Sequence, residues 1–462
     1  MHASSTHAPI SIDRLADGLD GRVIGPEDSD YDAMRTVVAG GVDRRPAAIV
    51  RVASAADVAR VIRVAHETGA ELAVRSGGHS GAAHGTTDGG IIIDVRDLRQ
   101  IDLDVDARTV WAGSGLTAGE LTAEVTSHGL VVGFGDTGSV GLGGITTGGG
   151  VGYLARRDGL TIDNLIGAEI VTADGEVLEI DAESHPDLFW AIRGGGGNFG
   201  VVTRFHYRLN ELPAFYGGML FLPATPDTVA GFMAASAAAP EELTTIANVM
   251  TAPPMPFLPE EWVGRIVIMG MIAYAGDAEA GERAVAPFRA LAEPLADMVK
   301  ASPYSEMFPP EDPDSEYHPT AVAVNMHIDH VDREVAATIL DHLERSDASL
   351  AAAQLRQLGG AMARVPADAT AYAHRSSPIM VNLAAFYEGE ADRPPKEAWL
   401  REFQAAIDQG DPAVYANFLA DEGPERVRAA YPGATWDRLG QIKRRYDPTN
   451  LFRLNQNIAP AT

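Results

Sequence analysis

The residues with the clearest chemical potential form a short turn, Arg75-Ser76-Gly77-Gly78-His79-Ser80, directly after an apolar run at 72–74. Glycine lets a backbone approach a ligand closely and adopt positive φ, and successive backbone N–H groups in such a turn suit an anion. A histidine at this place can coordinate a metal, shuttle a proton or form a covalent bond. The turn therefore predicts contact with a large, phosphate-bearing cofactor.

Two further segments carry unusual numbers of glycines. Residues 133–152 contain too many for a regular element throughout, and Arg193-Gly194-Gly195-Gly196-Gly197-Asn198-Phe199-Gly200 forms a second glycine-rich loop. Such backbone is typical of chain pressed against a flat or close partner. We expect both segments to contact the same cofactor as the histidine turn, the second one at its edge.

Composition excludes several classes of function. The 462 residues carry a net charge of -28, which repels nucleic acid and anionic membranes. Cysteine is absent, which excludes disulfides, iron–sulfur ligation, thiolate nucleophiles and cysteinyl cofactor links. We see no transmembrane run, no secretory pattern and no metal site. A cytoplasmic protein is therefore expected, with secretion left open and the oligomeric state unpredicted.

The pattern of apolar residues predicts an α+β protein. Strands are expected at 45–52, 72–74, 91–95, 101–105, 109–113 and 201–209, a hairpin at 168–180, and helices at 54–68, 116–128 and 184–192. After Pro213 the glycine density falls, and strands at 217–222, 246–250, 266–274, 321–328 and 379–387 mix with helices at 228–238, 278–293 and 333–346. We interpret the second part as an antiparallel sheet covered by helices, and the acidic run Glu311-Asp312-Pro313-Asp314 as a solvated loop.

Five motifs in order carry a resemblance to a known family. They are the histidine turn, the 193–200 loop, Gly159-Leu160-Thr161-Ile162-Asp163-Asn164, Tyr415-Ala416-Asn417-Phe418 and Asn455-Gln456-Asn457-Ile458. In this order they resemble the berberine bridge enzyme-like FAD-linked oxidases of the vanillyl-alcohol oxidase/PCMH superfamily, over nearly the whole chain. The local sequence of residues 148–154 resembles that of the family members that are similar to 6-hydroxy-D-nicotine oxidase.

The resemblance implies a split architecture. A PCMH-type FAD-binding domain of two α/β subdomains would occupy residues 1–212, with its core at about 42–212. A substrate domain would span 213–430, and residues 431–462 would return to the FAD domain as a berberine-bridge-type segment. The break in glycine density near Pro213 agrees with this division.

The resemblance also implies how FAD is held. His79 matches the histidine that bonds to the flavin 8α carbon, and Thr137 stands where many members have a second, cysteinyl link, so one covalent link is implied. The implied cofactor-binding residues are His79, Arg75, Ser76, Gly77, Gly78, Ser80, Gly81, Thr137, Gly138, Val140, Gly141, Gly144, Gly150, Gly152, Asn164, Val201, Asn455 and Asn457.

Three residues are implied in reactivity. Val140 matches the position over the oxygen-reactive flavin carbon. A valine at this position resembles the oxidases of the family, whereas a larger residue resembles the dehydrogenases. Tyr415 matches the tyrosine that deprotonates substrate, and the strand that carries a carboxylate base in other members has Asn382 instead, as a polar contact. A free tyrosine titrates near pH 10, so Tyr415 needs a cation or hydrogen bonds to lower its pKa. Arg375 and His374 are the candidates that the sequence offers.

The resulting hypothesis is an oxidase that takes hydride from a C–O or C–N bond of a small polar substrate and passes the electrons to molecular oxygen, giving hydrogen peroxide. A flavin-dependent dehydrogenase, an NADPH-linked reductase on the same fold and a non-catalytic binding protein remain alternatives. Alternation along the strands suggests pocket walls around Asn248, Tyr274, Asn325, Asn382 and Tyr387. The substrate itself is not predicted.

Overall fold

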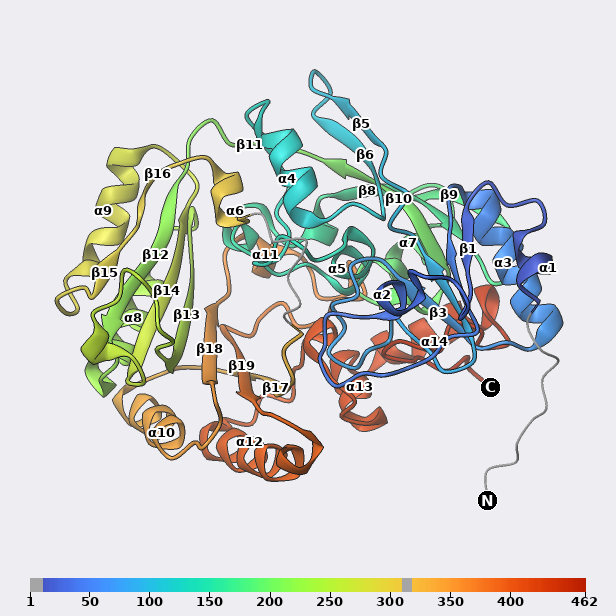
Figure 1. The fold of residues 1–462 in the computed structure, drawn as a ribbon. Helices are drawn as coiled ribbons and strands as arrows, with labels where there is room; N and C mark the ends of the chain where they lie inside the picture. Colours follow the sequence, from blue (N-terminus) through green and yellow to red (C-terminus); the bar gives the residue numbers. More distant parts are fainter. Residues whose placement is uncertain (1–10, 310–317) are drawn as a thin grey trace.

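The computed structural model describes residues 11–309 and 318–462, so the acidic run at 311–314 lies outside the described residues. The ribbon forms two lobes (Figure 1): one contains two small sheets and the chain's C-terminal helices, and the other is built on one large sheet. Among the described helices, none combines the length and apolar character needed to cross a lipid bilayer.

The first small sheet positions the histidine turn. Its strands are ordered β1-β2-β4-β3, with β2, β4 and β3 parallel and β1 antiparallel to β2. The bounds are β1 (Arg22–Ile24), β2 (Ala48–Arg51), β3 (Leu72–Arg75), β4 (Ile91–Asp94) and the covering helix α3 (Ala55–Thr68). Ser54 caps α3 and Gly69 ends it in a left-handed conformation, in agreement with the helix predicted at 54–68. The carboxyl end of β3 leads directly into the turn.

The second small sheet carries the glycine-rich segments. It is antiparallel in the order β5-β6-β10-β8-β9. Its elements are β5 (Ile101–Asp104), β6 (Thr109–Gly113), β8 (Leu165–Val171), β9 (Val177–Asp181) and β10 (Val201–Arg208), with α4 (Ala118–Thr126) and α7 (Pro186–Ile192). Part of the glycine segment is helical after all, as α5 (Leu142–Gly148). Buried apolar residues of both helices and four of these strands (β6, β8, β9 and β10) form one core.

The large sheet has eight strands in the order β15-β12-β14-β13-β18-β19-β17, with β16 pairing to β12. Its strands are β12 (Tyr216–Pro223), β13 (Leu243–Thr251), β14 (Ile266–Tyr274), β15 (Ala296–Asp297), β16 (Lys300–Ala301), β17 (Ala321–Ile328), β18 (Ala351–Gln357) and β19 (Ile379–Phe386). The helices α8 (Pro226–Ala238), α9 (Ala278–Arg289), α10 (Arg333–Glu344) and α12 (Arg393–Ile407) cover its outer face (Figure 1). The other face is directed toward the first lobe, because Arg356 of β18 bonds Asp136 and the Val151 carbonyl there.

The sequence reading missed β18 and α12. The β18 sequence is rich in alanine and glutamine, which favour helix in isolation, but pairing with β13 and β19 places it inside the sheet. The prediction that Tyr274 and Tyr387 belong to the pocket walls was also wrong. Tyr274 and Tyr387 pack with the core under the helices, not on the open face.

The C-terminal segment packs onto the first lobe. The helices α13 (Pro424–Ala430) and α14 (Ala434–Tyr446) lie beside it (Figure 1), and Leu439 and Ile458 belong to its core. Lys443, fully buried, donates to Asp447 at 2.7 Å and to the carbonyls of Asn198 and Phe452. This clamp fixes the chain that leads to Asn455. The predicted domain bounds as such stay a prediction.

The remaining elements are short. They are α1 (Ile12–Ala16), α2 (Tyr31–Arg35), β7 (Leu130–Val131), α6 (Ala155–Asp158), β11 (Asn210–Glu211) and α11 (Ala361–Arg364), with 3-10 turns at Thr161–Asp163, Gly196–Asn198, Glu260–Trp262, Tyr304–Met307, Glu390–Asp392 and Ala416–Phe418.

Candidate cofactor and active site

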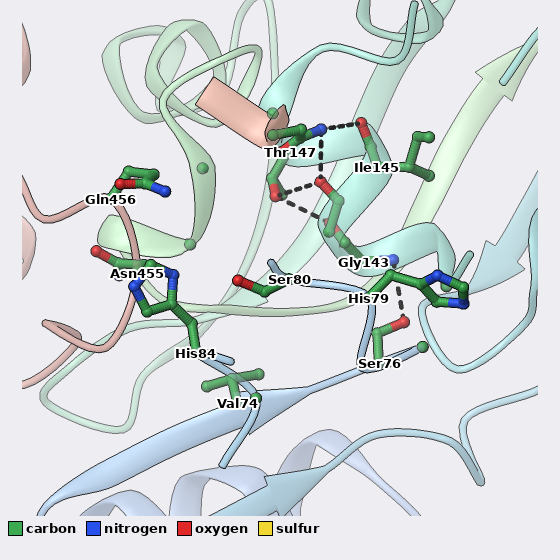
Figure 2. Close-up of a pocket in the computed structure, with 18 of the residues that line it drawn as sticks. Val74, Ser76, His79, Ser80, His84, Gly143, Ile145, Thr147, Asn455 and Gln456 are labelled. Atoms are coloured by element: carbon green, nitrogen blue, oxygen red, sulfur yellow. Dashed lines mark hydrogen bonds between the residues drawn. The ribbon is translucent and has the colours of Figure 1, made fainter. Parts of the chain in front are cut away.

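One cavity of about 390 Å³ lies between the histidine turn, the glycine segment and the C-terminal segment. Figure 2 shows the histidine turn and β3 below it, Ile145 and Thr147 of α5 above it, and Asn455 and Gln456 at one side. The predicted site residues that line it are Arg75, Ser76, Gly77, Gly78, His79, Ser80, Thr137, Val140, Gly141, Gly144, Val201, Tyr415 and Asn455. Residues more than 300 positions apart in the sequence therefore meet at one cavity.

The histidine turn is anchored by a buried ion pair. Arg75 is 2% exposed and donates to Asp94 at 2.8 Å, across the parallel strands β3 and β4. Burial raises the pKa of Asp94, but the hydrogen bond from Arg96 and the charge of Arg75 outweigh it and leave the pKa below its ordinary value. Arg75 therefore fixes the end of the strand from which the turn starts.

The glycine segment passes the turn at backbone contact. A Cβ on Gly77 would lie 2.3 Å from the amide nitrogen of Gly141, and a Cβ on Gly141 would lie 2.2 Å from that of Gly77. Neither position can hold a side chain without moving the other loop. The two loops form one wall, built from backbone.

The cavity wall fits a large planar cofactor with a polar tail. A Cβ added to Gly144 or Gly197 would meet no atom within 4 Å, and both residues line the cavity, so the missing side chains leave room there. Asn455 donates to the Phe452 carbonyl at 3.0 Å, while its buried Oδ1 has no hydrogen-bond partner. A buried, unsatisfied amide oxygen is costly unless a ligand donor satisfies it. These features suit FAD.

His84 also lines the cavity, and Figure 2 shows it next to Asn455. Burial and the charge of Arg44 lower its pKa to about 4, against a partial opposite effect of Asp421. A neutral imidazole is therefore expected at neutral pH. His84 was not among the predicted site residues, although it lies only five residues after His79.

Tyr415 reaches the cavity from the segment before the 3-10 turn Ala416–Phe418. It is 2% exposed, and its phenolic oxygen accepts hydrogen bonds from the Gly150 amide at 2.9 Å and from Asn417 Nδ2 at 3.0 Å. Burial raises the pKa of Tyr415 by more than these two donors and the charge of Arg356 lower it, so the pKa stays above its ordinary value. Donors aimed at the oxygen stabilise a phenolate, so the geometry suits a proton acceptor.

The cation near Tyr415 is Arg356, not Arg375 or His374 as the sequence suggested. Arg375 is committed to Asp163 at 2.7 Å, and His374 hydrogen-bonds the Ala429 carbonyl. Arg356 is buried, stacks over the Phe418 ring at 5.0 Å and donates to Asp136 at 2.5 Å. The sequence did not predict this contact, because Arg356 is distant from Tyr415 in the chain and lies on β18, a strand that was not predicted.

A row of four amide side chains crosses the open face of the large sheet. Asn248, Gln354, Asn382 and Asn325 are consecutive register partners on β13, β18, β19 and β17. Gln354 donates to Asn248, and Asn325 accepts from the Tyr415 backbone amide at 2.6 Å. Asn382 is outside the cavity lining, half-buried, and its Oδ1 has no hydrogen-bond partner. Within this row, the Asn382 amide is available to form a hydrogen bond with a ligand.

Six other predicted residues also lie outside the cavity lining: Gly81, Gly138, Gly150, Gly152, Asn164 and Asn457. Gly150 supports Tyr415 instead, and a Cβ on Gly152 would lie 1.8 Å from the Phe134 carbonyl oxygen. Asn164 donates to the carbonyls of Asp158 and Leu160. Gly150, Gly152 and Asn164 thus shape the loops that carry the wall, and contact of the six residues with a cofactor stays a prediction.

Several lining residues were not predicted individually. They include Asp136, Gly143, Ile145, Thr147, Gly196, Gly197, Asn198, Asn417, Phe418 and Gln456. Most lie inside segments that the sequence reading had singled out for their glycines or motifs. For Thr147 the signal is the helical period of α5, because it lies four residues after Gly143 and shares its face of the helix.

The chain is similar to FAD-linked proteins over most of its length. A family model described as an FAD binding domain matches residues 46–181, and one described as berberine and berberine like matches residues 414–459. The (R)-6-hydroxynicotine oxidase of Paenarthrobacter nicotinovorans is 31% identical over 491 aligned positions, which cover 99% of this chain and 99% of that protein.

The fold is also similar to those of solved structures of FAD-linked oxidases and berberine bridge enzyme-like proteins. The crystal structure of 6-hydroxy-D-nicotine oxidase from Arthrobacter nicotinovorans superposes with a TM-score of 0.84 at 28% identity, covering 96% of this chain and 98% of the other. BBE-like 1 of Physcomitrella patens gives a TM-score of 0.86 at 21% identity, covering 98% and 100%, which is a likeness of fold. The predicted α+β fold class is confirmed.

Proposed function

Because this chain belongs to the berberine bridge enzyme-like family of FAD-linked oxidoreductases, as its motifs predicted, we propose that it is an oxidase with FAD bonded covalently to His79. FAD as cofactor and an oxidoreductase activity follow from the family. The covalent link, the oxygen chemistry and the residue roles are our proposal. In it, the enzyme oxidises a C–O or C–N bond of a small polar substrate and releases hydrogen peroxide.

One observation carries this proposal: His79 and Tyr415 line the same cavity, against the backbone wall that the histidine turn and the glycine segment form. Bound FAD supplies the hydride acceptor. The chain supplies the rest, because hydride loss from the carbon of an alcohol or of a protonated amine requires removal of the O–H or N–H proton. Tyr415 is the residue that takes this proton.

The surroundings of Tyr415 support that role. The Gly150 amide and Asn417 Nδ2 donate to its oxygen and would hold the phenolate after proton loss. Arg356 adds a positive charge, and its donor bond to the Val151 carbonyl at 3.2 Å ties it to the residue next to Gly150. Together they counter part of the effect of burial on the pKa of the tyrosine.

Val140 supports the oxidase half of the proposal. It lines the cavity within the glycine wall, and its small side chain leaves access for molecular oxygen. Single attachment is supported by Thr137, which lies in the same wall and offers no thiol. We propose that a small ring-containing substrate binds against the amide row. The name of the relative, (R)-6-hydroxynicotine oxidase, gives a first compound class to screen.

The proposal is tested by anaerobic titration of the purified protein with candidate alcohols and amines, followed by admission of air. The expected result is loss of the oxidised flavin absorbance, recovery in air, and one peroxide for each substrate oxidised. Reduction without reoxidation by air would favour a dehydrogenase. Reduction by NADPH would favour the reductase, and no reduction by any compound would favour a binding protein.

A further inference from the structure

The imidazole of His79 has a defined partner in the opposite loop. Ser139 Oγ lies 3.0 Å from His79 Nε2, within hydrogen-bond distance. The contact joins the histidine turn to the glycine wall across 60 residues of sequence. None of the five motifs contains Ser139, so its part at the site comes from the structure alone.

Ser139 is held from both sides by backbone bonds to α4. The Gly119 amide donates to the Gly138 carbonyl at 2.8 Å, and the Ala118 amide donates to the Val140 carbonyl at 2.9 Å. These two anchors fix the backbone position from which the Ser139 hydroxyl extends. Small displacements of this segment would break bonds to the helix.

The histidine side of the contact is fixed as well. A Cβ on Gly77 would lie 3.0 Å from the Ser139 carbonyl oxygen, so the two loops are at backbone contact next to the hydrogen bond. Ser76 Oγ donates to the Ser114 carbonyl at 2.7 Å and accepts from the Gly143 amide at 3.3 Å. Backbone packing therefore sets the separation of the two loops from which the Ser139 and His79 side chains meet.

We propose that Ser139 is a positioning residue for the covalent attachment of FAD: its hydroxyl holds one ring nitrogen of His79 and thereby orients the other toward the flavin 8α carbon. This inference rests on the proposed function, because it requires the histidyl link. A fixed imidazole reacts faster, because less orientation has to be found during the reaction.

The attachment balances with molecular oxygen as the oxidant. One N–C bond forms between His79 and the 8α carbon, while one methyl C–H bond and the imidazole N–H bond break. The electron pair passes through the flavin to dioxygen, which takes up the two protons and leaves as hydrogen peroxide. Ser139 is not consumed and changes only the rate and the yield.

The test measures attachment directly and needs no substrate. Apoprotein of the full chain is mixed with FAD in air, samples are precipitated with acid over time, and the flavin retained in the pellet is measured. Wild type, Ser139→Ala, Ser139→Thr and His79→Ala are compared, with Ser184→Ala as a control. Ser184 donates to the Glu179 carbonyl in an exposed loop of the same lobe. Non-covalent FAD binding and melting temperature are recorded for each.

Wild type and Ser184→Ala should retain the flavin and His79→Ala should release it. Ser139→Ala should bind FAD and melt like wild type but attach it about tenfold more slowly, the loss expected for one hydrogen bond. Ser139→Thr keeps the hydroxyl and should restore much of the rate, which separates the hydrogen bond from a general loss of packing. Attachment by Ser139→Ala at the wild-type rate would overturn the inference alone, whereas flavin released by wild type would overturn the covalent link as well.

Discussion

The two sides of the site are built in different ways. The cofactor side is made of backbone: Gly77 and Gly141 touch through their main chains, and Gly144 leaves room by having no side chain. The side toward the large sheet is made of side chains, among them Arg356, Gln354 and Asn382 on neighbouring strands. In our proposal the first side holds the cofactor and the second side contacts the substrate.

The largest effect is expected at the backbone wall. Gly144→Val adds a branched side chain where a Cβ would project into the cavity, so flavin binding should fall by about 100-fold or more, as for a severe clash in a packed site. Absorbance of the purified protein near 450 nm checks this. Gly81→Val is the matched control, since its Cβ also meets no atom but the residue lies outside the cavity lining. Equal flavin content in both variants would contradict the backbone account.

The next effect concerns the tyrosine between the two sides. Tyr415→Phe removes the proton acceptor and should slow flavin reduction by substrate by about 10²–10⁴-fold, the usual contribution of a general base, with flavin content unchanged. Anaerobic stopped-flow absorbance measures this rate. Tyr372→Phe is the control: its ring lies 5.9 Å from that of Tyr415, but its buried hydroxyl has no partner. If both variants reduced flavin at the same rate, Tyr415 would not be the base.

Acid should lower the free energy of unfolding through a buried histidine of the large sheet. His327 of β17 is fully buried, and burial lowers its pKa to about 4, helped by His374 and Arg426 and opposed by the Ala413 carbonyl and Asp411. Because the folded state then binds fewer protons than the unfolded state, stability is complete above about pH 6.5 and falls toward pH 4, by about 3 kcal/mol at most.

Urea unfolding of the apoprotein between pH 7 and pH 4 measures this loss. His327→Gln removes the titrating group and should flatten the pH dependence in that window. The same slope in the variant and in wild type would assign the acid sensitivity to other groups, such as His84, whose pKa is also lowered to about 4.

The smallest effect is expected on the sheet face itself. Asn382→Leu removes an amide oxygen that has no partner within the protein, so stability and flavin content should stay as in wild type. Catalytic efficiency with a hydrogen-bonding substrate should fall by about tenfold, from loss of one hydrogen bond. Steady-state kinetics on a substrate found in the screen would measure it, and unchanged efficiency would remove Asn382 from the substrate contacts.

The same division explains what the sequence could predict. The glycine segments, His79 and the helix caps at Ser54 and Gly69 act through local rules of backbone conformation, which are visible in the sequence. Arg356 and Ser139 act through contacts made by packing of distant segments, and no local pattern signals them. Tyr274 was assigned to the wrong face, because a one-residue change in strand register moves a side chain to the other face of the sheet.

The most direct test of the central claim is mass spectrometry of tryptic peptides from the purified yellow protein. The account predicts that the peptide Ser76–Arg96 carries the mass of one FAD, that fragment ions assign it to His79 and not to His84, and that the peptide containing Thr137 is unmodified. An unmodified Ser76–Arg96 peptide in protein that holds a full complement of flavin would contradict attachment at His79.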